Sequence, residues 1–124
     1  MKVRRAALED VDDVAGHACA FVIGMRKPLA LAFDATGFEM FYAEAMEHDH
    51  IAFWVAEQYG EVIGSCAAVC FPMFFAPKFW TSQEIMLWVN AGYRDGRASG
   101  LLLDAMSDWS VGNGCGQLVA SCTD

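Results

Sequence analysis

The chain has 124 residues, of which 56% are hydrophobic, so it is long enough for one domain with a buried core and too short for two. Its formal net charge of −8 excludes a general nucleic-acid binder, because phosphate backbones are held by basic surfaces. We therefore expect residues 1–124 to form a single domain.

The first half of the chain predicts a short strand and two helices. KVRRAAL alternates over a few residues and suits a first strand. In the helix that follows, four acids crowd the first turns, where the helix dipole favours them. Gly24 and Pro28 then mark a loop, and FEMFYAEAMEH indicates a second, moderately amphipathic helix. The apolar residues that recur at helical spacing in the first helix are Leu8, Val11, Val14, Ala15, Ala18 and Val22.

The second half predicts three strands, a helix and a last strand. IAFWVAEQYGEVIGSCAAVCF is typical of a hairpin, with strands over 51–57 and from 62 to about 71 and a turn at Tyr59–Gly60. The aromatic loop PMFFAPKFW leads into a strand in SQEIMLWVN. A helix from about Arg97 to Asn113 ends at glycines, and QLVASC is the final strand. The order β-α-α-β-β-β-α-β favours an α/β or α+β sheet with helices on its faces.

The junction NAGYRDGRASG between the last long strand and its helix carries the chemistry of an anion site. A helix N-terminus exposes unpaired N–H groups, and Arg94 and Arg97 add fixed positive charge there. A tight turn with solvated arginines is the alternative, because GRASG lacks the Lys-Ser/Thr of a P-loop and the strict dinucleotide motif. The small residues that would let a phosphate approach the backbone are Gly96, Ala98, Ser99 and Gly100.

IMLWVNAGYRDGRASGLLLDAMSDWSVGNGCGQLVAS resembles the central coenzyme-A motif of the GCN5-related N-acetyltransferases (GNAT). That motif runs from an apolar strand ending in V-x-x-x-(Y/H)-R through a small-residue loop to a helix with paired leucines, and then to a glycine-rich turn and a strand. VRRAALEDVDDVAGHA and FWVAEQYGEVIGSCAAV resemble the family's first strand and helix and its hairpin, where G-x-x-I/V-G is typical. The resemblance covers nearly the whole chain. It implies a mixed, mostly antiparallel central sheet flanked by helices.

The loop RDGRASG departs from the family's commonest pattern, R-x-x-G-x-G/A. Arg97 and Ser99 stand where the two motif glycines are usual. The loop is more similar to an R-G-G-R-A-A variant that is associated with phage-encoded members, and FFAPKFWTSQEIMLWV resembles that subgroup as well. The resemblance thus implies a phage-related protein, located in the host cytoplasm or the virion.

The resemblance also implies a cofactor, acetyl-CoA, and a place for each of its parts. The pantetheine arm would pair with the strand ending at Val89 and Asn90, and the backbone N–H groups near Leu87 to Val89 would hold the thioester carbonyl. This strand is typically splayed from the next one, here QLVASC, and the gap admits the cofactor. The pyrophosphate would lie on the loop formed by Arg94, Asp95, Gly96, Arg97, Ala98, Ser99 and Gly100.

Glu84 is the candidate catalytic base, since the family often places a glutamate on the strand that leads into this loop. Strand alternation predicts that Glu84 shares a face with Met86 and Trp88, opposite Leu87 and Val89. A carboxyl beside apolar residues has a raised pKa, which suits a base. An ordinary strand-end acid in solvent is the alternative.

The family normally continues with another helix and two strands, which often supply a tyrosine for the leaving thiolate, whereas this chain stops at Asp124. We therefore expect a fold truncated after the fifth strand, as a natural short form, a fragment, or a protein completed by another subunit. The open edge of QLVASC suggests a homo-oligomer, because natural proteins seldom leave an edge bare. Two functions remain open: an acyl-CoA-dependent N-acyltransferase acting on a small-molecule or protein amine, and a non-catalytic structural or interaction module of the same fold.

Other features predict less. EHDHI lacks further ligands for a metal, so we expect no metal site. The five cysteines form no CxxC pair, which indicates reduced, mostly buried thiols in a cytoplasmic protein, with a catalytic thiol as the alternative. No run is long enough to span a membrane, and the N-terminus lacks the apolar core of a signal peptide. The aromatic loop suits core packing, a substrate wall or a partner surface.

Overall fold

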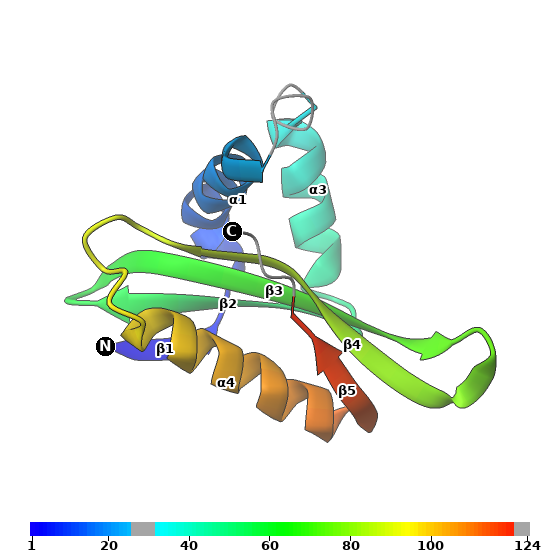
Figure 1. Cartoon of the computed structure of the whole chain (residues 1–124). Coiled ribbons are helices and arrows are strands. Elements are labelled where there is room, and N and C mark those ends of the chain that lie inside the picture. The colour runs from blue at the N-terminus through cyan, green and yellow to red at the C-terminus, as the bar shows by residue number, and fades with distance from the viewer. Residues whose placement is uncertain (26–31, 121–124) are drawn as a thin grey trace.

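The chain folds into a five-stranded sheet with helices on both faces, as the computed structural model shows for residues 1–25 and 32–120 (Figure 1). The strands lie in sequence order, and only β4 and β5 pair in parallel. The predicted element order and the mixed, mostly antiparallel sheet are therefore confirmed. The elements are β1 (Lys2–Arg5), the 3-10 turn η1 (Leu8–Asp10), α1 (Val11–Met25), α3 (Ala35–Ala45), β2 (Ile51–Gln58), β3 (Glu61–Met73), β4 (Ala76–Val89), α4 (Arg97–Gly112) and β5 (Cys115–Val119).

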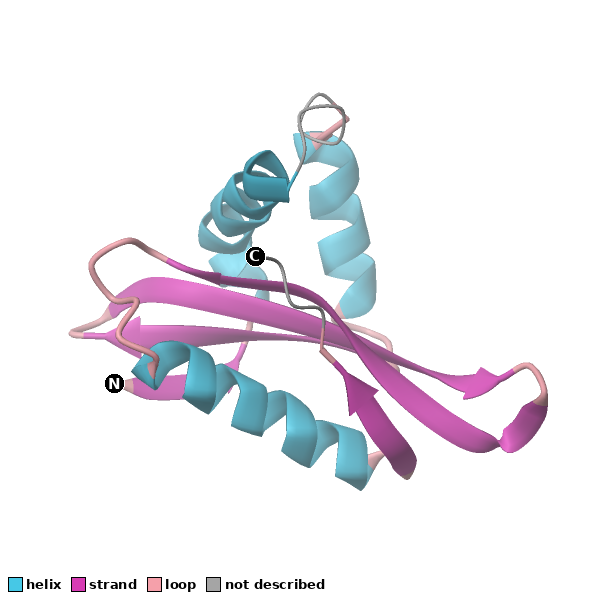
Figure 2. Ribbon diagram, viewed as in Figure 1, coloured by secondary structure: helices cyan, strands magenta, loops and turns pink. Residues whose placement is uncertain are grey.

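The sheet separates two hydrophobic cores. Helices α1 and α3 cover one face, and α4 covers the other (Figure 2). Successive residues of β2 point alternately into the two cores. Trp54 packs in the core under α4 (the α4 core), whereas Phe53 and Val55 pack in the core under α1 and α3 (the α1–α3 core). A strand that is buried on both faces reads as a continuous apolar run, which explains the sequence IAFWVA.

Two predicted boundaries differ from the structure. Helix α3 begins at Ala35, because the Asp34 carboxylate accepts a hydrogen bond from the Gly37 amide at 3.1 Å and so caps a turn that was not predicted as helix. The final strand is Cys115–Val119. The loop predicted around Pro28 and the end of QLVASC lie outside the described residues.

The predicted aromatic loop is instead the tip of a long hairpin formed by β3 and β4, which extends beyond the rest of the sheet (Figure 1). Pairing with β2 ends opposite Val69 of β3, so Pro72 lies in a part of β3 where a missing N–H removes no bond to β2. Phe74 and Phe75 are 92% and 68% exposed at the turn. Core packing, one of the roles proposed for this segment, is therefore wrong for the tip.

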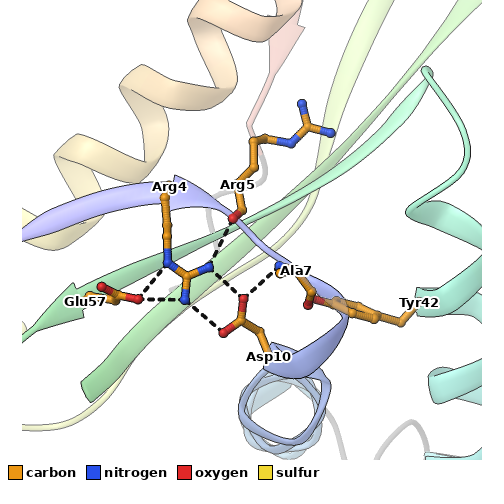
Figure 3. A network of polar contacts seen from close by, with 6 residues as sticks. All are labelled: Arg4, Arg5, Ala7, Asp10, Tyr42 and Glu57. Carbon is orange, nitrogen blue, oxygen red and sulfur yellow. Dashed lines mark hydrogen bonds and ion pairs between the residues drawn. The ribbon is translucent and has the colours of Figure 1, made fainter. Parts of the chain in front are cut away.

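A buried acid joins the start of the chain to the sheet (Figure 3). The Arg4 guanidinium of β1 donates to both carboxylate oxygens of Asp10, at 2.7 and 3.0 Å, and also to Glu57 of β2. The same carboxylate accepts from the Ala7 amide at 2.7 Å, and the Ala7 carbonyl accepts from the Tyr42 hydroxyl of α3. Hydrogen bonds from Arg4 hold the pKa of Asp10 below its usual range, although burial opposes this shift.

Candidate active site

The junction after β4 has the shape that its sequence predicts. Gly92 and Gly96 take positive φ angles of 96° and 91°, a left-handed conformation that glycine adopts without strain. Gly96 is the N-cap of α4, and the Asp95 carboxylate accepts from the Arg97 amide at 3.0 Å. The turn therefore brings residues 95–100 together around the first amides of a 16-residue helix.

The small residues of this turn have different tasks. Ala98 is fully buried and packs in the α4 core, so its size serves close packing of the helix on the sheet. The Ser99 hydroxyl donates to the Gly96 carbonyl at 3.2 Å, and the Gly100 amide donates to the same oxygen at 3.0 Å. Arg97 is exposed at the helix start. An anion at this end of α4 would lie near the positive end of the helix dipole and near the exposed guanidinium of Arg97.

Arg94 lies apart from Arg97. Its Nε donates to the Val89 carbonyl at 2.6 Å, and its guanidinium carbon lies 4.4 Å from the centre of the Trp88 ring. The arginine thus folds back over the end of β4, where a cation–π contact holds it. A carbonyl oxygen has two lone pairs, so Val89 can accept from Arg94 and from a second donor together.

Strand β5 accompanies only part of β4. Its pairing runs from Trp80 to Gln83, where Gln83 lies opposite Val119, and no described residue of β5 pairs with β4 beyond that point. The predicted pantetheine positions lie in this further part: Leu87 pairs with Cys66 of β3, and Val89 pairs with Gly64. The Asn90 amide is already used, because it donates to the Ile63 carbonyl at 2.8 Å.

A bulge changes the face that Glu84 occupies. Met86 pairs with Ala67, yet Glu84 pairs with Ala68, so Ile85 has no partner across the β3–β4 ladder. Ala68 packs in the α4 core and Ala67 in the α1–α3 core. The expectation that Glu84 shares a face with Met86 and Trp88 is therefore wrong, because the extra residue turns Glu84, which is 3% exposed, toward α4.

Cys66 also indicates that the Glu84 side chain lies on the α4 side of the sheet. Burial raises the pKa of the Cys66 thiol, and the negative charge of Glu84 raises it further. The Cys66 thiol donates to the Leu102 carbonyl of α4. Burial likewise raises the pKa of Cys70 to about 11. Both thiols are therefore protonated at neutral pH, which argues against the catalytic-thiol alternative for these two residues.

An apolar pocket of about 500 Å³ lies on the opposite face of β4, between the strand and the helices α1 and α3. The sequence does not predict this pocket, because its walls come from separate elements that each have the apolar pattern of a core. Hydrophobic periodicity predicts on which face of an element an aromatic residue lies. It does not show whether side chains of other elements fill the space next to that face. The pocket is lined by Ala18, Phe21, Val22, Phe33, Phe38, Phe41, Phe53, Gln83, Glu84, Ile85 and Met86.

Two kinds of site are absent from the part of the chain that the structure describes. No three His, Cys, Asp or Glu side chains within residues 1–25 and 32–120 come together as metal ligands. Among the same residues, no helix has the length and hydropathy needed to cross a membrane.

The family model of the acetyltransferase (GNAT) family matches residues 19–124. The chain belongs to the GNAT family. No curated protein sequence is a significant match to it. The GNAT fold is also found in solved structures with little sequence identity, so the likeness to them is one of fold alone.

Three such structures show the extent of the likeness. A predicted acetyltransferase from Clostridium acetobutylicum with acetyl-CoA has a TM-score of 0.81 at 14% identity, over 99% of this chain and 81% of its own. The aminoglycoside N-acetyltransferase AAC(6′)-Iy in complex with CoA has a TM-score of 0.78 at 17% identity, over 98% and 76%. A ribosomal-protein-alanine N-acetyltransferase from Brucella melitensis has a TM-score of 0.70 at 14% identity, over 99% and 81%.

Proposed function

We propose that this GNAT protein is an acyl-CoA-dependent N-acyltransferase that transfers an acetyl group from acetyl-CoA to an amine. The observation that carries the proposal is the arrangement at the end of β4. Beyond Gln83, no described residue of β5 pairs with β4. Strand β4 then leads through a glycine turn into the N-terminus of α4. The first of these features supplies backbone for the pantetheine arm, and the second supplies amides for the pyrophosphate.

Acetyl-CoA would supply an activated carbonyl as a thioester, and the residues of the chain would bind and orient it. Arg97 and the amides of residues 95–99 would hold the phosphates, while the β4 backbone from Leu87 to Val89 would hold the arm and the carbonyl oxygen. The Asp95 carboxylate accepts from the Arg97 amide in the structure, so a phosphate bound at this amide would displace the carboxylate. Arg94 remains on Trp88 and Val89 and stiffens the end of the strand.

In the transfer, the amine nitrogen would form a bond to the thioester carbonyl carbon while the C–S bond breaks. Of the two protons that the ammonium loses, one would protonate the departing CoA thiolate and the other needs an acceptor. We propose Glu84 as that acceptor, through a water molecule in the gap where β4 and β5 part. Its support is its burial and its position one residue beyond the last β5 pair. Because the Glu84 side chain faces α4, a water would link it to an amine on the other side of the strand.

We expect acetyl-CoA to bind in the micromolar range, and Arg97→Ala to weaken binding about tenfold, since a charged hydrogen bond contributes roughly 1.5–3 kcal/mol. Isothermal titration calorimetry with acetyl-CoA and CoA measures both. Arg5→Ala is the matched control, because Arg5 stacks on Trp54 at 5.4 Å and lies on β1, away from the junction. No binding by a folded, monodisperse sample would overturn the proposed function.

If Glu84 is the proton acceptor, Glu84→Gln should lower kcat roughly 10²- to 10⁴-fold and leave the affinity for acetyl-CoA within about twofold. Steady-state kinetics measures kcat, and calorimetry with acetyl-CoA measures the affinity. Glu61→Gln removes an exposed carboxylate at the start of β3 and serves as a control for charge alone. A Glu84→Gln enzyme with unchanged kcat would remove Glu84 from the mechanism.

A non-catalytic module of the GNAT fold is the second candidate, and the exposed hairpin tip favours it. Phe74 and Phe75 stack edge to face with ring centres 5.2 Å apart and stand away from the sheet, as a partner-binding surface would. The phage association and a homodimer through the outer edge of β5 remain predictions. Loss of acetyl-CoA binding together with capture of a partner by the intact hairpin would favour this candidate.

A further inference from the structure

We propose that the apolar pocket receives an aromatic or branched alkyl group of the acceptor, so that the protein acts on amines with an apolar substituent. The inference rests on the proposed function and adds its substrate class. It is carried by three properties of the apolar pocket: the chemistry of its walls, its size, and its place beside β4.

The walls of the apolar pocket exclude a charged occupant. Four elements contribute aromatic or aliphatic side chains, and the polar residues along it are Gln83 and Glu84. Of these two, Glu84 faces α4 from the bulge, so Gln83 is the polar side chain on the pocket's own face. An ammonium group buried among phenylalanines would lose its hydration without gaining an anion, whereas a ring or alkyl group would be stabilised there.

The size of the apolar pocket fits a substituent rather than a single methyl group. An apolar cavity of about 150 Å³ accommodates benzene. The volume of about 500 Å³ found here therefore admits a one- or two-ring group, or a branched chain, with room for the linker to the nitrogen. Phe41 is 41% exposed at the wall and gives such a group a way in from solvent.

The position of the apolar pocket directs the amine to the reaction. It borders β4 from Gln83 to Met86, and pairing with β5 ends at Gln83. A ring held in the pocket would leave its amine at the mouth, near the exposed Gln83, whose amide oxygen can accept from an ammonium N–H. From there the nitrogen lies one residue along β4 from Glu84, the proposed proton acceptor, on the strand that continues to the positions proposed for the thioester. The net charge of −8 also attracts a cationic acceptor.

The test compares 2-phenylethylamine with ethylamine, which has the same amine without the ring, by calorimetry on the full chain with and without CoA. We expect the ring to tighten binding at least tenfold, because even a methylene-sized difference in an apolar pocket changes selectivity roughly 10- to 200-fold. Ala18→Leu fills the pocket from α1, and Phe41→Ala removes part of its wall. Each should reduce the advantage of the ring by about tenfold and leave CoA binding unchanged.

Phe71→Ala is the matched control, because Phe71 is 39% exposed, nearly as much as Phe41 at 41%, and lies on the hairpin away from the apolar pocket. Equal affinity for the two amines, or an advantage that survives both pocket variants, would overturn the inference. So would tighter binding of longer acyl-CoA chains that Ala18→Leu abolishes, since the pocket would then hold the acyl group. Absence of CoA binding would overturn the proposed function instead, while the amine titration without CoA still decides the inference.

Discussion

Replacing Asp10 with alanine is expected to lower the free energy of unfolding by about 3 kcal/mol, the lower end of the range for breaking a buried ion pair. The carboxylate is 5% exposed and accepts two hydrogen bonds from Arg4 and one from the Ala7 amide. Its removal leaves the Ala7 amide and one side of the guanidinium without their partner. The estimate stays at the lower end because the Arg4 side chain is 29% exposed and retains Glu57.

Asp12→Ala is the control for this experiment, because Asp12 is exposed in the first turn of α1 and acts on the helix dipole alone. Its loss should cost about 0.3–1 kcal/mol. Urea unfolding followed by circular dichroism measures both variants. Equal losses for Asp10 and Asp12 would show that the buried network adds nothing.

The contribution of Asp10 should also depend on pH. Because the pKa of Asp10 is lowered in the folded protein, the unfolded chain binds its proton at the higher pH. The stability gained from the pair is therefore complete above the unfolded pKa, roughly 4, and is lost as pH falls through the folded pKa. The difference in stability between the natural chain and Asp10→Asn should be constant from about pH 5 to 8 and shrink toward pH 2.

The second large effect is expected from Gly64→Ala, which should cost about 2 kcal/mol of stability and weaken acetyl-CoA binding together. A Cβ at Gly64 would lie 2.9 Å from the Trp88 carbonyl oxygen and 3.3 Å from the Val89 side chain. The first contact is with backbone, so β4 must shift at the place proposed for the pantetheine arm. Overpacking of this kind costs roughly 1–3 kcal/mol.

Gly16→Ala is the matched control for Gly64→Ala, since a Cβ at this position in the middle of α1 would have no atom within 4 Å apart from its chain neighbours and the backbone of its own helix. It should raise stability by about 0.5–1 kcal/mol, because alanine is the better helix former. Thermal unfolding of both variants measures stability, and calorimetry measures acetyl-CoA binding. Together they separate the cost of the close contact at Gly64 from the general effect of replacing glycine with alanine. A Gly64→Ala protein with unchanged stability would mean that β3 and β4 part there without cost.

The elements and their order could be predicted from the sequence because the information is local. The continuous apolar run at the start of Ile51–Gln58, helical spacing in α1 and the glycines at the junction each specify backbone within a few residues. The hairpin pattern also contains Gly64, whose close approach to Trp88 gives a physical reason for a residue without a side chain there.

What could not be predicted depends on partners that are distant in the sequence. Asp10 reads as one of several acids at a helix start, and only the fold brings Arg4 and Glu57 to it. The hairpin tip reads as a loop because its prolines are allowed only where a strand lacks a second neighbour. The apolar pocket needs four elements at once, so no single segment carries a signal for it.

The bulge at Ile85 reverses the alternation of side chains between the two faces of β4. Whether Ile85 takes part in the ladder therefore decides which groups lie on each face. Ser82, before the bulge, bonds to Ser110 of α4, while Met86, after it, packs toward α1 and α3. Deleting Ile85 would remove the bulge and leave Glu84 and Met86 on their present faces, because neighbouring residues of a regular strand alternate. Taking Ile85 into regular pairing would instead drive the carboxylate of Glu84 in among the phenylalanines while Gln83 turned to α4. The polarity of both faces thus depends on the bulge, which holds one residue out of the ladder and so keeps the carboxylate on the α4 side.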